Sequence, residues 1–395
     1  MTRHSPAAGT LRPLPKRRPA QHCRPMTFAP MPQVIAAIRR GEQIVLVDDE
    51  DRENEGDLVI AAQHADAKAI AFMATKACGL ICLAMEGRIC DRLGLPLMTT
   101  SNHSRHGTAF TSSIEAREGV TTGISAADRA RTIAVATALE ARPEDIVVPG
   151  HVFPLRARDG GVLVRAGHTE AAVDLARLAG CTPAAVICEI MKPDGTMARL
   201  PDLRAYAAEH GLLLATIADL ISWRETRERL VDAVAEALLD TPWGQVRAYS
   251  YFSQVTREHH LALVKGERLR PGNEVDVPVL VRVQKAMALA DVFGQAGPVP
   301  VGTTLKQIAE AEDGVLLYMH DANGRGLHAQ LAALGSPRQD APIPGMAMDH
   351  REYGIGAQIL HHLGVRRMRL VTASDRPIAS LSGHGLEIVE RVKPG

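Results

Sequence analysis

The sequence has few aromatic residues, no excess of either charge and no long apolar run. Phe, Trp and Tyr make up 3% of the 395 residues, which argues against a surface that stacks nucleic-acid bases. Lys plus Arg equals Asp plus Glu at 45 each, so the whole chain has no bias towards nucleic acid or anionic membranes. No stretch approaches the ~18 apolar residues of a membrane span. We therefore expect a soluble, cytoplasmic protein of two or three domains.

Cysteine is also scarce, and its distribution is uneven. The six cysteines are irregularly spaced and several lie in apolar stretches, which favours free thiols in a reducing compartment over a disulfide framework. No cysteine follows Cys188. The second half of the chain therefore has no thiolate of its own with which to bind a metal.

The first 26 residues contain no acidic residue and no apolar core of the kind found in secretory signals. They contain six basic residues and five prolines. We expect a disordered basic extension or a misassigned start upstream of Met26, with an organellar transit segment as the alternative.

A dense acidic stretch follows the apolar run Gln43–Val47. Seven of the ten residues from Asp48 to Asp57 carry carboxylates. Mg²⁺ prefers oxygen ligands and usually takes one or two carboxylates together with substrate and water, so this stretch is suited to a hard cation. Arg52 would either neutralise part of the charge or hold a phosphate through a bidentate contact. A solvated acidic turn remains the alternative on composition alone.

Alternating strands and helices predict an α/β or α+β fold for the first ~200 residues. The patterns indicate strands at 43–48 and 57–62 and a helix at 67–77. A charged amphipathic stretch over 222–239 predicts a helical connector, and a strand-rich segment begins at Thr241. We therefore expect one domain over 27–225, a helical linker over 226–240 and a second domain over 241–395.

Three further features could belong to a site. The segment Arg165–Thr169 places Arg, Gly, His and Thr before a helix, which suits a phosphate cradle but also fits an ordinary helix start. Glu189 ends an apolar strand and either faces solvent or points into a site. His151 follows a Pro-Gly pair in a turn and indicates nothing by itself.

Taken in order, these motifs closely resemble one enzyme family. From about Phe28 to Trp223 the chain contains RENEGDL, HGTAF, ISAADR, PGHVFPL, RAGHTEAAVDL and CEIM, and it resembles 3,4-dihydroxy-2-butanone 4-phosphate synthase of riboflavin biosynthesis. The resemblance implies a Mg²⁺-dependent lyase that converts D-ribulose 5-phosphate to 3,4-dihydroxy-2-butanone 4-phosphate and formate. It also implies a homodimer with the active site at the subunit interface. Because histidine is a soft ligand for Mg²⁺, we expect Mn²⁺ to substitute for it.

The resemblance also implies the site residues. Glu53 and His168 would bind the metal, and His151 and Glu189 would complete the catalytic set. The residues implied to contact the sugar phosphate are Arg52, Glu53, Asp57, Thr108, Arg165, Ala166, Gly167, His168, Thr169 and Glu189.

From about Thr241 onwards the chain resembles GTP cyclohydrolase II, through TPWG, HLALVKG, LADVFG, NGRGL and DHREYGIGAQIL. The resemblance implies a catalytic Zn²⁺ held by three cysteines around the DVFG segment. Those positions here hold Met287, Pro298 and Pro300, and none of these residues supplies a thiolate. Gln284 stands where that family has a histidine.

Asp349 and Arg351 match the catalytic pair of the cyclohydrolase family and are treated as vestigial. We expect no zinc and a catalytically silent second domain. The alternatives are a truly bifunctional enzyme whose zinc has other ligands, and a scaffolding protein that has lost both activities.

Overall fold

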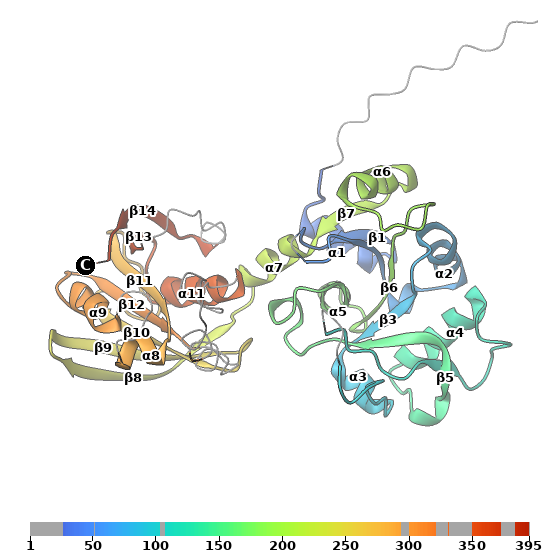
Figure 1. Ribbon diagram of the computed structural model, residues 1–395, viewed down its shortest axis with the longest axis horizontal. Helices are drawn as coiled ribbons and strands as arrows, with labels where there is room; N and C mark the ends of the chain where they lie inside the picture. Colours follow the sequence, from blue (N-terminus) through green and yellow to red (C-terminus); the bar gives the residue numbers. More distant parts are fainter. Residues whose placement is uncertain are drawn as a thin grey trace, which may run out of the picture.

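The computed structural model describes residues 27–50, 52–102, 107–293, 300–320, 331, 350–372 and 384–394. These residues form two domains, each built around a 7-stranded sheet, and helix α7 (Ile217–Glu225) lies between them (Figure 1). The predicted α/β (α+β) fold class is therefore confirmed. The basic segment 1–26 lies outside the described residues, and its predicted disorder stays a prediction.

The sheet of the N-terminal domain has the order β4-β5-β3-β6-β2-β1-β7. Strand β1 pairs antiparallel with β2 and parallel with β7, and β3 pairs parallel with β5. The two cores on either side of the sheet follow from side-chain alternation, since Val45 and Val47 pack on one face and Ile44 and Leu46 on the other. The strands are β1 Ile44–Val47, β2 Gly56–Ala61, β3 Cys82–Met85, β4 Ile114–Ala116, β5 Ile146–Arg156, β6 Ala184–Glu189 and β7 Leu213–Thr216.

Helices cover both faces of this sheet. Helices α2, α4 and α6 pack on one face, and α1, α5 and α7 pack on the other. Local sequence specifies several helix starts, because the side chains of Asp66, Ser125 and Thr216 accept hydrogen bonds from the first turns of α2, α4 and α7. The helices are α1 Met31–Arg39, α2 Ala67–Phe72, α3 Gly87–Arg92, α4 Ala126–Thr137, α5 His168–Leu178 and α6 Leu200–His210, with short turns at η1 Ala62–His64, η2 Met73–Ala77, η3 Pro143–Asp145 and η4 Gly161–Leu163.

The sheet of the C-terminal domain has the order β14-β13-β11-β12-β10-β9-β8. Helix α9 packs on one face through Ile308, and α11 packs on the other through Ile355 and Ile359. The elements are β8 Val231–Thr241, β9 Gly244–Ser253, β10 His259–Lys265, β11 Val279–Lys285, α8 Ala288–Phe293, α9 Val301–Ala309, β12 Gly314–Met319, α11 His350–His362, β13 Arg367–Val371 and β14 Glu387–Val392.

The helical linker predicted over 226–240 is wrong. Helix α7 ends at Glu225, and Val231–Thr241 forms β8 at the edge of the second sheet. Strand β8 pairs antiparallel with β9 from Val231 to Thr241, and a two-residue turn closes the hairpin. The pairing with β9 outweighs the helical periodicity of this mostly exposed stretch. The strand-rich domain therefore begins near residue 231 rather than 241.

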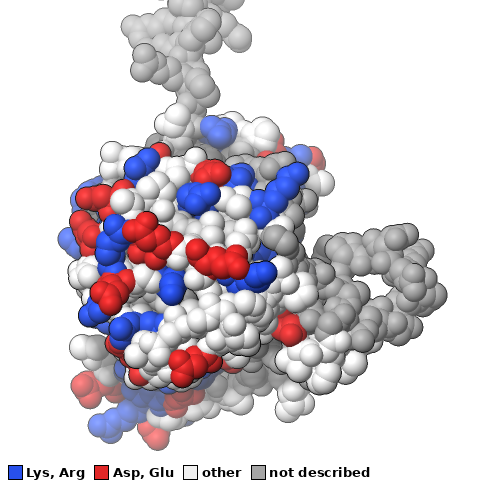
Figure 2. Space-filling model, turned by 90° about the vertical axis from the view of Figure 1, so that its left-hand side faces the viewer, with Lys and Arg blue, Asp and Glu red and all other residues white. Residues whose placement is uncertain are grey.

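Two sequence-based expectations about composition can be compared with the described residues. The cysteines at 78, 82, 90, 181 and 188 form no disulfide. No helix in the described ranges has the length and apolar character needed to cross a membrane. On the face of the C-terminal domain seen in Figure 2, basic and acidic side chains are interspersed, which matches the balanced charge of the chain.

Candidate active site

The two predicted metal ligands lie together where β1 ends. Glu53 lies in the loop between β1 and β2, and His168 begins α5. The distance from Oε2 of Glu53 to Nδ1 of His168 is 3.7 Å. Asp48, the first residue after β1, joins them, and each of the three offers a ligand atom within 4.8 Å of the others. In the sequence alone, Asp48 is only one member of the acidic stretch.

A backbone contact orients the His168 ring. Its Nε2 lies 3.2 Å from the carbonyl oxygen of Leu46 on β1, so Nε2 donates a hydrogen bond and Nδ1 faces the carboxylates. Burial disfavours the charged ring, but Asp57 and Glu53 outweigh burial and raise the pKa of His168 to about 9. Without a metal, the ring therefore carries a proton that a cation would displace.

Asp57 presents a buried oxygen that needs a partner. The residue lies on β2 and is almost completely buried, and its Oδ1 has no hydrogen-bond partner among the described residues. Nδ1 of His168 is 3.8 Å from this oxygen. Burial raises the pKa of Asp57 to about 7 even though His168 opposes the shift. An oxygen-rich donor set with an unsatisfied carboxylate oxygen fits a hard cation such as Mg²⁺.

Arg52 neutralises the acidic loop in this structure. Its Nη1 donates to Oδ2 of Asp48 at 2.8 Å and to Oε2 of Glu53 at 2.6 Å. The close contact with the His168 ring, opposed by burial and reinforced by Arg52, lowers the pKa of Glu53 to about 2. Of the two roles that the sequence left open for Arg52, the structure shows the ion pairing.

The segment Arg165–Thr169 has the geometry expected of an anion site. Gly167 is the N-cap of α5, and a Cβ at this position would clash with the Arg165 guanidinium. Nη2 of Arg165 lies 3.3 Å from Oγ1 of Thr108, so these two predicted residues come together. Nη1 of Arg165 donates to Oε2 of Glu170 at 2.6 Å. Ala166 and Thr169 belong to the same segment, and a helix start beside a guanidinium attracts phosphate.

Strand register places Glu189 next to Asp57. The two residues are directly opposite in the antiparallel β2–β6 pair. The Leu80 amide donates to Oε2 of Glu189 at 3.0 Å. A Cβ at Gly79 would clash with the Glu189 carbonyl oxygen, so only glycine allows the chain to pass this close. Glu189 therefore lies beside the candidate metal site, and the backbone amide of Leu80 fixes its side chain.

His151 lies apart from this cluster. It is on β5, and β3 and β6 separate β5 from β2, which corresponds to roughly 14 Å across three strand spacings. Its Nδ1 is 2.6 Å from Oε2 of Glu115 on β4. Glu115 and Glu170 could not be recognised from the sequence, because an isolated acid near a turn or in the first turn of a helix has an ordinary structural explanation.

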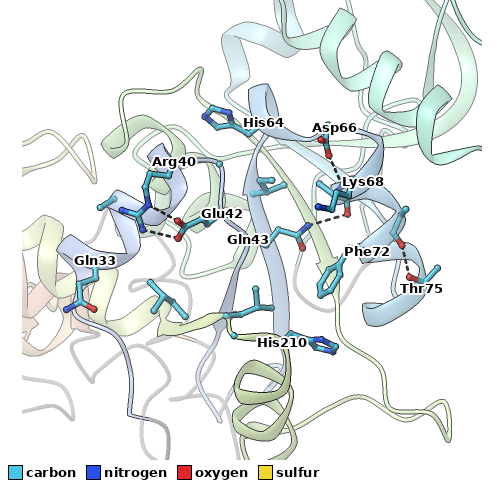
Figure 3. Close-up of a pocket in the computed structure, with 18 of the residues that line it drawn as sticks. Gln33, Arg40, Glu42, Gln43, His64, Asp66, Lys68, Phe72, Thr75 and His210 are labelled. Carbon is cyan, nitrogen blue, oxygen red and sulfur yellow. Dashed lines mark hydrogen bonds and ion pairs between the residues drawn. The ribbon is translucent and has the colours of Figure 1, made fainter.

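A separate hollow of about 1110 Å³ lies at the other end of β1, next to Gln43 (Figure 3). Nε2 of the Gln43 side chain donates to the Ala69 carbonyl oxygen at 3.3 Å, and Arg40 forms an ion pair with Glu42. None of the predicted site residues lines this hollow. It is therefore distinct from the candidate metal site formed by Asp48, Glu53 and His168.

In the C-terminal domain, protein groups surround the carboxylate of Asp291. The carboxylate accepts hydrogen bonds from Nε2 of Gln284 at 3.0 Å, the Met287 amide at 2.9 Å and the Tyr318 hydroxyl at 2.6 Å. Met287 is buried, and Pro300 is the N-cap of α9. Within the described ranges, the only His, Cys, Asp and Glu group suited to a metal is Asp48, Glu53 and His168.

Three residues named from the sequence cannot be placed. Pro298 and Asp349 lie outside the described residues, and so does the side chain of Arg351. Their predicted roles stay predictions.

Comparisons with known proteins cover nearly the whole chain. A family model described as 3,4-dihydroxy-2-butanone 4-phosphate synthase matches residues 32–223, and one described as GTP cyclohydrolase II matches residues 232–393. The riboflavin biosynthesis protein RibBA of Aquifex aeolicus is 49% identical, over 92% of this chain and 92% of its own length.

Two similar proteins carry only the synthase name. The 3,4-dihydroxy-2-butanone 4-phosphate synthase of Neisseria meningitidis is 46% identical, over 92% of this chain and 97% of its own length. The crystal structure of RibBX, a two-domain 3,4-dihydroxy-2-butanone 4-phosphate synthase from A. baumannii, matches with a TM-score of 0.76 and 42% identity. That match covers 92% of this chain and 99% of the other.

Proposed function

The chain belongs to the family of riboflavin biosynthesis proteins that join a 3,4-dihydroxy-2-butanone 4-phosphate synthase domain to a GTP cyclohydrolase II-like domain, and on this premise we propose a specific activity for it. It converts D-ribulose 5-phosphate to 3,4-dihydroxy-2-butanone 4-phosphate and formate, and it depends on Mg²⁺ or Mn²⁺. The observation that carries this proposal is the convergence of Asp48, Glu53 and His168 beside a buried Asp57 oxygen that has no hydrogen-bond partner among the described residues.

Three residues would hold the cation. Glu53 and Asp48 offer carboxylate oxygens, and His168 offers Nδ1 because its Nε2 is bonded to the Leu46 carbonyl. When bound, the cation would polarise the ketose oxygens and stabilise the negative charge that develops on them. Asp57 lies at the buried end of this set and keeps an oxygen directed at His168.

The phosphate would bind at the start of α5. Arg165 is held there by Glu170 and Thr108, so its guanidinium is already ordered before substrate arrives. The backbone at His168 and Thr169 adds the N–H groups of a helix start, while the Gly167 N–H is bonded to the Arg165 carbonyl oxygen. Anchoring the phosphate at this point restricts where the sugar carbons can lie, and such restriction lowers the entropic barrier of a skeletal rearrangement.

Proton transfer would fall to groups around the sugar. Oε2 of Glu189 accepts the Leu80 amide, which leaves Oε1 to exchange a proton with substrate. His151 has its Nδ1 against Glu115, which leaves Nε2 for the same purpose. Removal of a proton next to a ketone needs a base within hydrogen-bond reach, and these two residues supply one on each side of strand β3.

We propose that the C-terminal domain is catalytically silent. Support comes from the Asp291 network, in which Gln284, Met287 and Tyr318 occupy the surroundings where the resemblance would require metal ligands. The full-length relatives named only as synthases agree with this proposal. The name RibBA on other relatives favours the alternative of a second, GTP-directed activity.

We also propose that the protein is a cytoplasmic homodimer. The support is the family resemblance, together with the position of His151 outside the cluster formed within one chain. The side chain of His151 is 45% exposed, so it is accessible to a substrate or to a second subunit.

A paired assay tests these proposals. Purified protein is stripped with a chelator and assayed for formate release from ribulose 5-phosphate, without metal and with Mg²⁺, Mn²⁺ or Zn²⁺. We expect no release without metal and recovery with Mg²⁺ and with Mn²⁺. The same preparation is assayed with GTP, and bound zinc is measured. Formate release that does not depend on metal would contradict the first proposal, and stoichiometric zinc with GTP turnover would contradict the second.

A further inference from the structure

A carboxylate–imidazole pair lies on the β4–β5 edge of the N-terminal sheet. Oε2 of Glu115 is 2.6 Å from Nδ1 of His151. The Glu115 side chain is 11% exposed and the His151 side chain is 45% exposed. The pair thus has a buried acidic end and an accessible imidazole end.

An irregularity in strand pairing brings the two side chains together. On β4, Ile114 pairs with Val152 and the next residue, Glu115, pairs with Val147. The residues Val148–His151 therefore have no partner in β4 and leave the regular ladder. Oγ of Ser113 accepts a hydrogen bond from the Gly150 amide at 3.2 Å, which ties this excursion to β4. Insertions of this kind redirect side chains, often next to active sites.

The other side of the Glu115 carboxylate is also fixed. Oγ1 of Thr132 on α4 donates to Oε1 of Glu115 at 3.3 Å, and the same hydroxyl accepts the Ala116 amide at 3.0 Å. Gly123 has a φ of +89°, and a Cβ there would clash with the Glu115 carboxylate and approach Nδ1 of His151. Only glycine readily adopts this positive φ and also leaves room for the Glu115 carboxylate. Thr132 on α4, the irregular part of β5 and Gly123 therefore together hold the Glu115 carboxylate against the His151 imidazole.

We propose that Glu115 is a positioning residue for the synthase reaction, a proposal that rests on the function proposed above. Nδ1 of His151 donates a hydrogen bond to the Glu115 carboxylate, so Nε2 keeps its lone pair and faces the accessible side. When Nε2 takes a proton from the substrate, the adjacent carboxylate balances the charge of the imidazolium. The same proton leaves from Nε2 in a later step, and Glu115 itself stays ionised throughout.

The test begins with Glu115→Gln, which keeps the shape of the side chain and removes its charge. We expect kcat for formate release to fall by about 10²-fold or more, with KM changed by less than about threefold, because the imidazolium loses its counter-charge. The acid limb of the pH–rate profile should also move to lower pH than in the wild type, because the imidazolium has lost its counter-charge. Glu118→Gln, an exposed neighbour, is the matched control and should behave as wild type. Glu115→Asp should recover part of the rate.

A double-variant cycle separates positioning from a purely structural role. If Glu115 acts through His151, then Glu115→Gln should cost little in a His151→Gln background, since the two losses would not add. Independent losses that multiply, or a Glu115→Gln variant with wild-type kcat, would overturn the proposal. A wild-type protein that releases no formate would instead contradict the function proposed for the chain.

A second readout does not depend on turnover. Nitrogen-15 spectra of histidine-labelled protein, assigned with His151→Gln, should show neutral His151 protonated at Nδ1 in the wild type. Glu115→Ala should shift the ring towards the other tautomer. The same tautomer in both proteins would overturn the positioning role even if the enzyme proved inactive.

Discussion

The two domains differ in how their candidate metal regions are satisfied. In the N-terminal domain, three ligand residues converge and a buried oxygen of Asp57 has no hydrogen-bond partner among the described residues. In the C-terminal domain, the carboxylate of Asp291 receives hydrogen bonds from Gln284, Met287 and Tyr318. Unsatisfied buried polar atoms are costly, so a site that keeps one is arranged for a ligand. A carboxylate that already accepts three hydrogen bonds from protein groups, as Asp291 does, has no such need.

The largest effect should come from removing a ligand in the first domain. His168→Asn is expected to abolish Mg²⁺ binding and to lower formate release by about 10³-fold or more, because the substitution removes an imidazole ligand. Calorimetric titration with Mg²⁺ and a formate assay would measure both effects. The matched control is Met287→Leu, a substitution of similar volume in the second domain, which should change neither quantity. Loss of activity in the control would break the contrast between the domains.

The next effect concerns the separation of His151 from the metal cluster. His151→Gln and His168→Asn should each be inactive alone. If the active site is shared between subunits, mixing the two after reversible dissociation should restore up to about a quarter of wild-type activity, since random pairing gives one complete site in half of the dimers. Light scattering would establish the dimer. An inactive mixture of verified mixed dimers would place His151 and the metal in the same chain.

Proton competition should make metal affinity depend on pH. The pKa of His168 is raised to about 9 in the metal-free protein, after burial, which opposes charge, is outweighed by Asp57 and Glu53. A cation must displace this proton below pH 9, so affinity should rise between pH 7 and 9 by at most about tenfold per unit. The slope should steepen below pH 7, where Asp57 also binds a proton because burial raises its pKa to about 7. Calorimetry in buffers of different ionisation enthalpy would count the released protons, and an affinity independent of pH would contradict the assignment.

The smallest effect should be confined to the second domain. Asp291→Asn should lower its free energy of unfolding by about 1–3 kcal/mol, because a hydrogen-bonded carboxylate loses its charge and one acceptor site. Denaturant unfolding followed by tryptophan fluorescence would report the change in a Trp223→Phe background, which leaves Trp243 as the one tryptophan, with the exposed Asp240→Asn as control. Formate release should stay within about twofold of wild type. A large loss of formate release would show that the second domain is coupled to the first.

Several of the predicted site residues could be named from the sequence because they lie in contiguous motifs. Arg52, Glu53 and Asp57 occupy one short stretch, and Arg165–Thr169 occupy another. Other residues near the candidate metal site could not be recognised in this way. Asp48 is one acid among many until the loop folds back on it, where its carboxylate accepts the amides of Glu53 and Glu55.

The error at residues 226–240 has a similar cause. The periodicity of this stretch fits a helix, and only its pairing with β9, a segment later in the chain, makes it strand β8. The periodicity of one segment does not contain the energy of a ladder formed with another segment, even with its hairpin neighbour. Glu115 was missed for the same reason, since its contact with His151 depends on the insertion in β5.

The sequence by itself determined the chemistry that each region can perform. It placed carboxylates and imidazoles in the first domain and left the second without a cysteine, and no fold can add a thiolate that the chain lacks. Only the tertiary structure decided which groups meet. Strand register set Glu189 opposite Asp57, and α5 brought His168 to the end of β1, because contacts between residues distant in sequence form only when the whole sheet assembles.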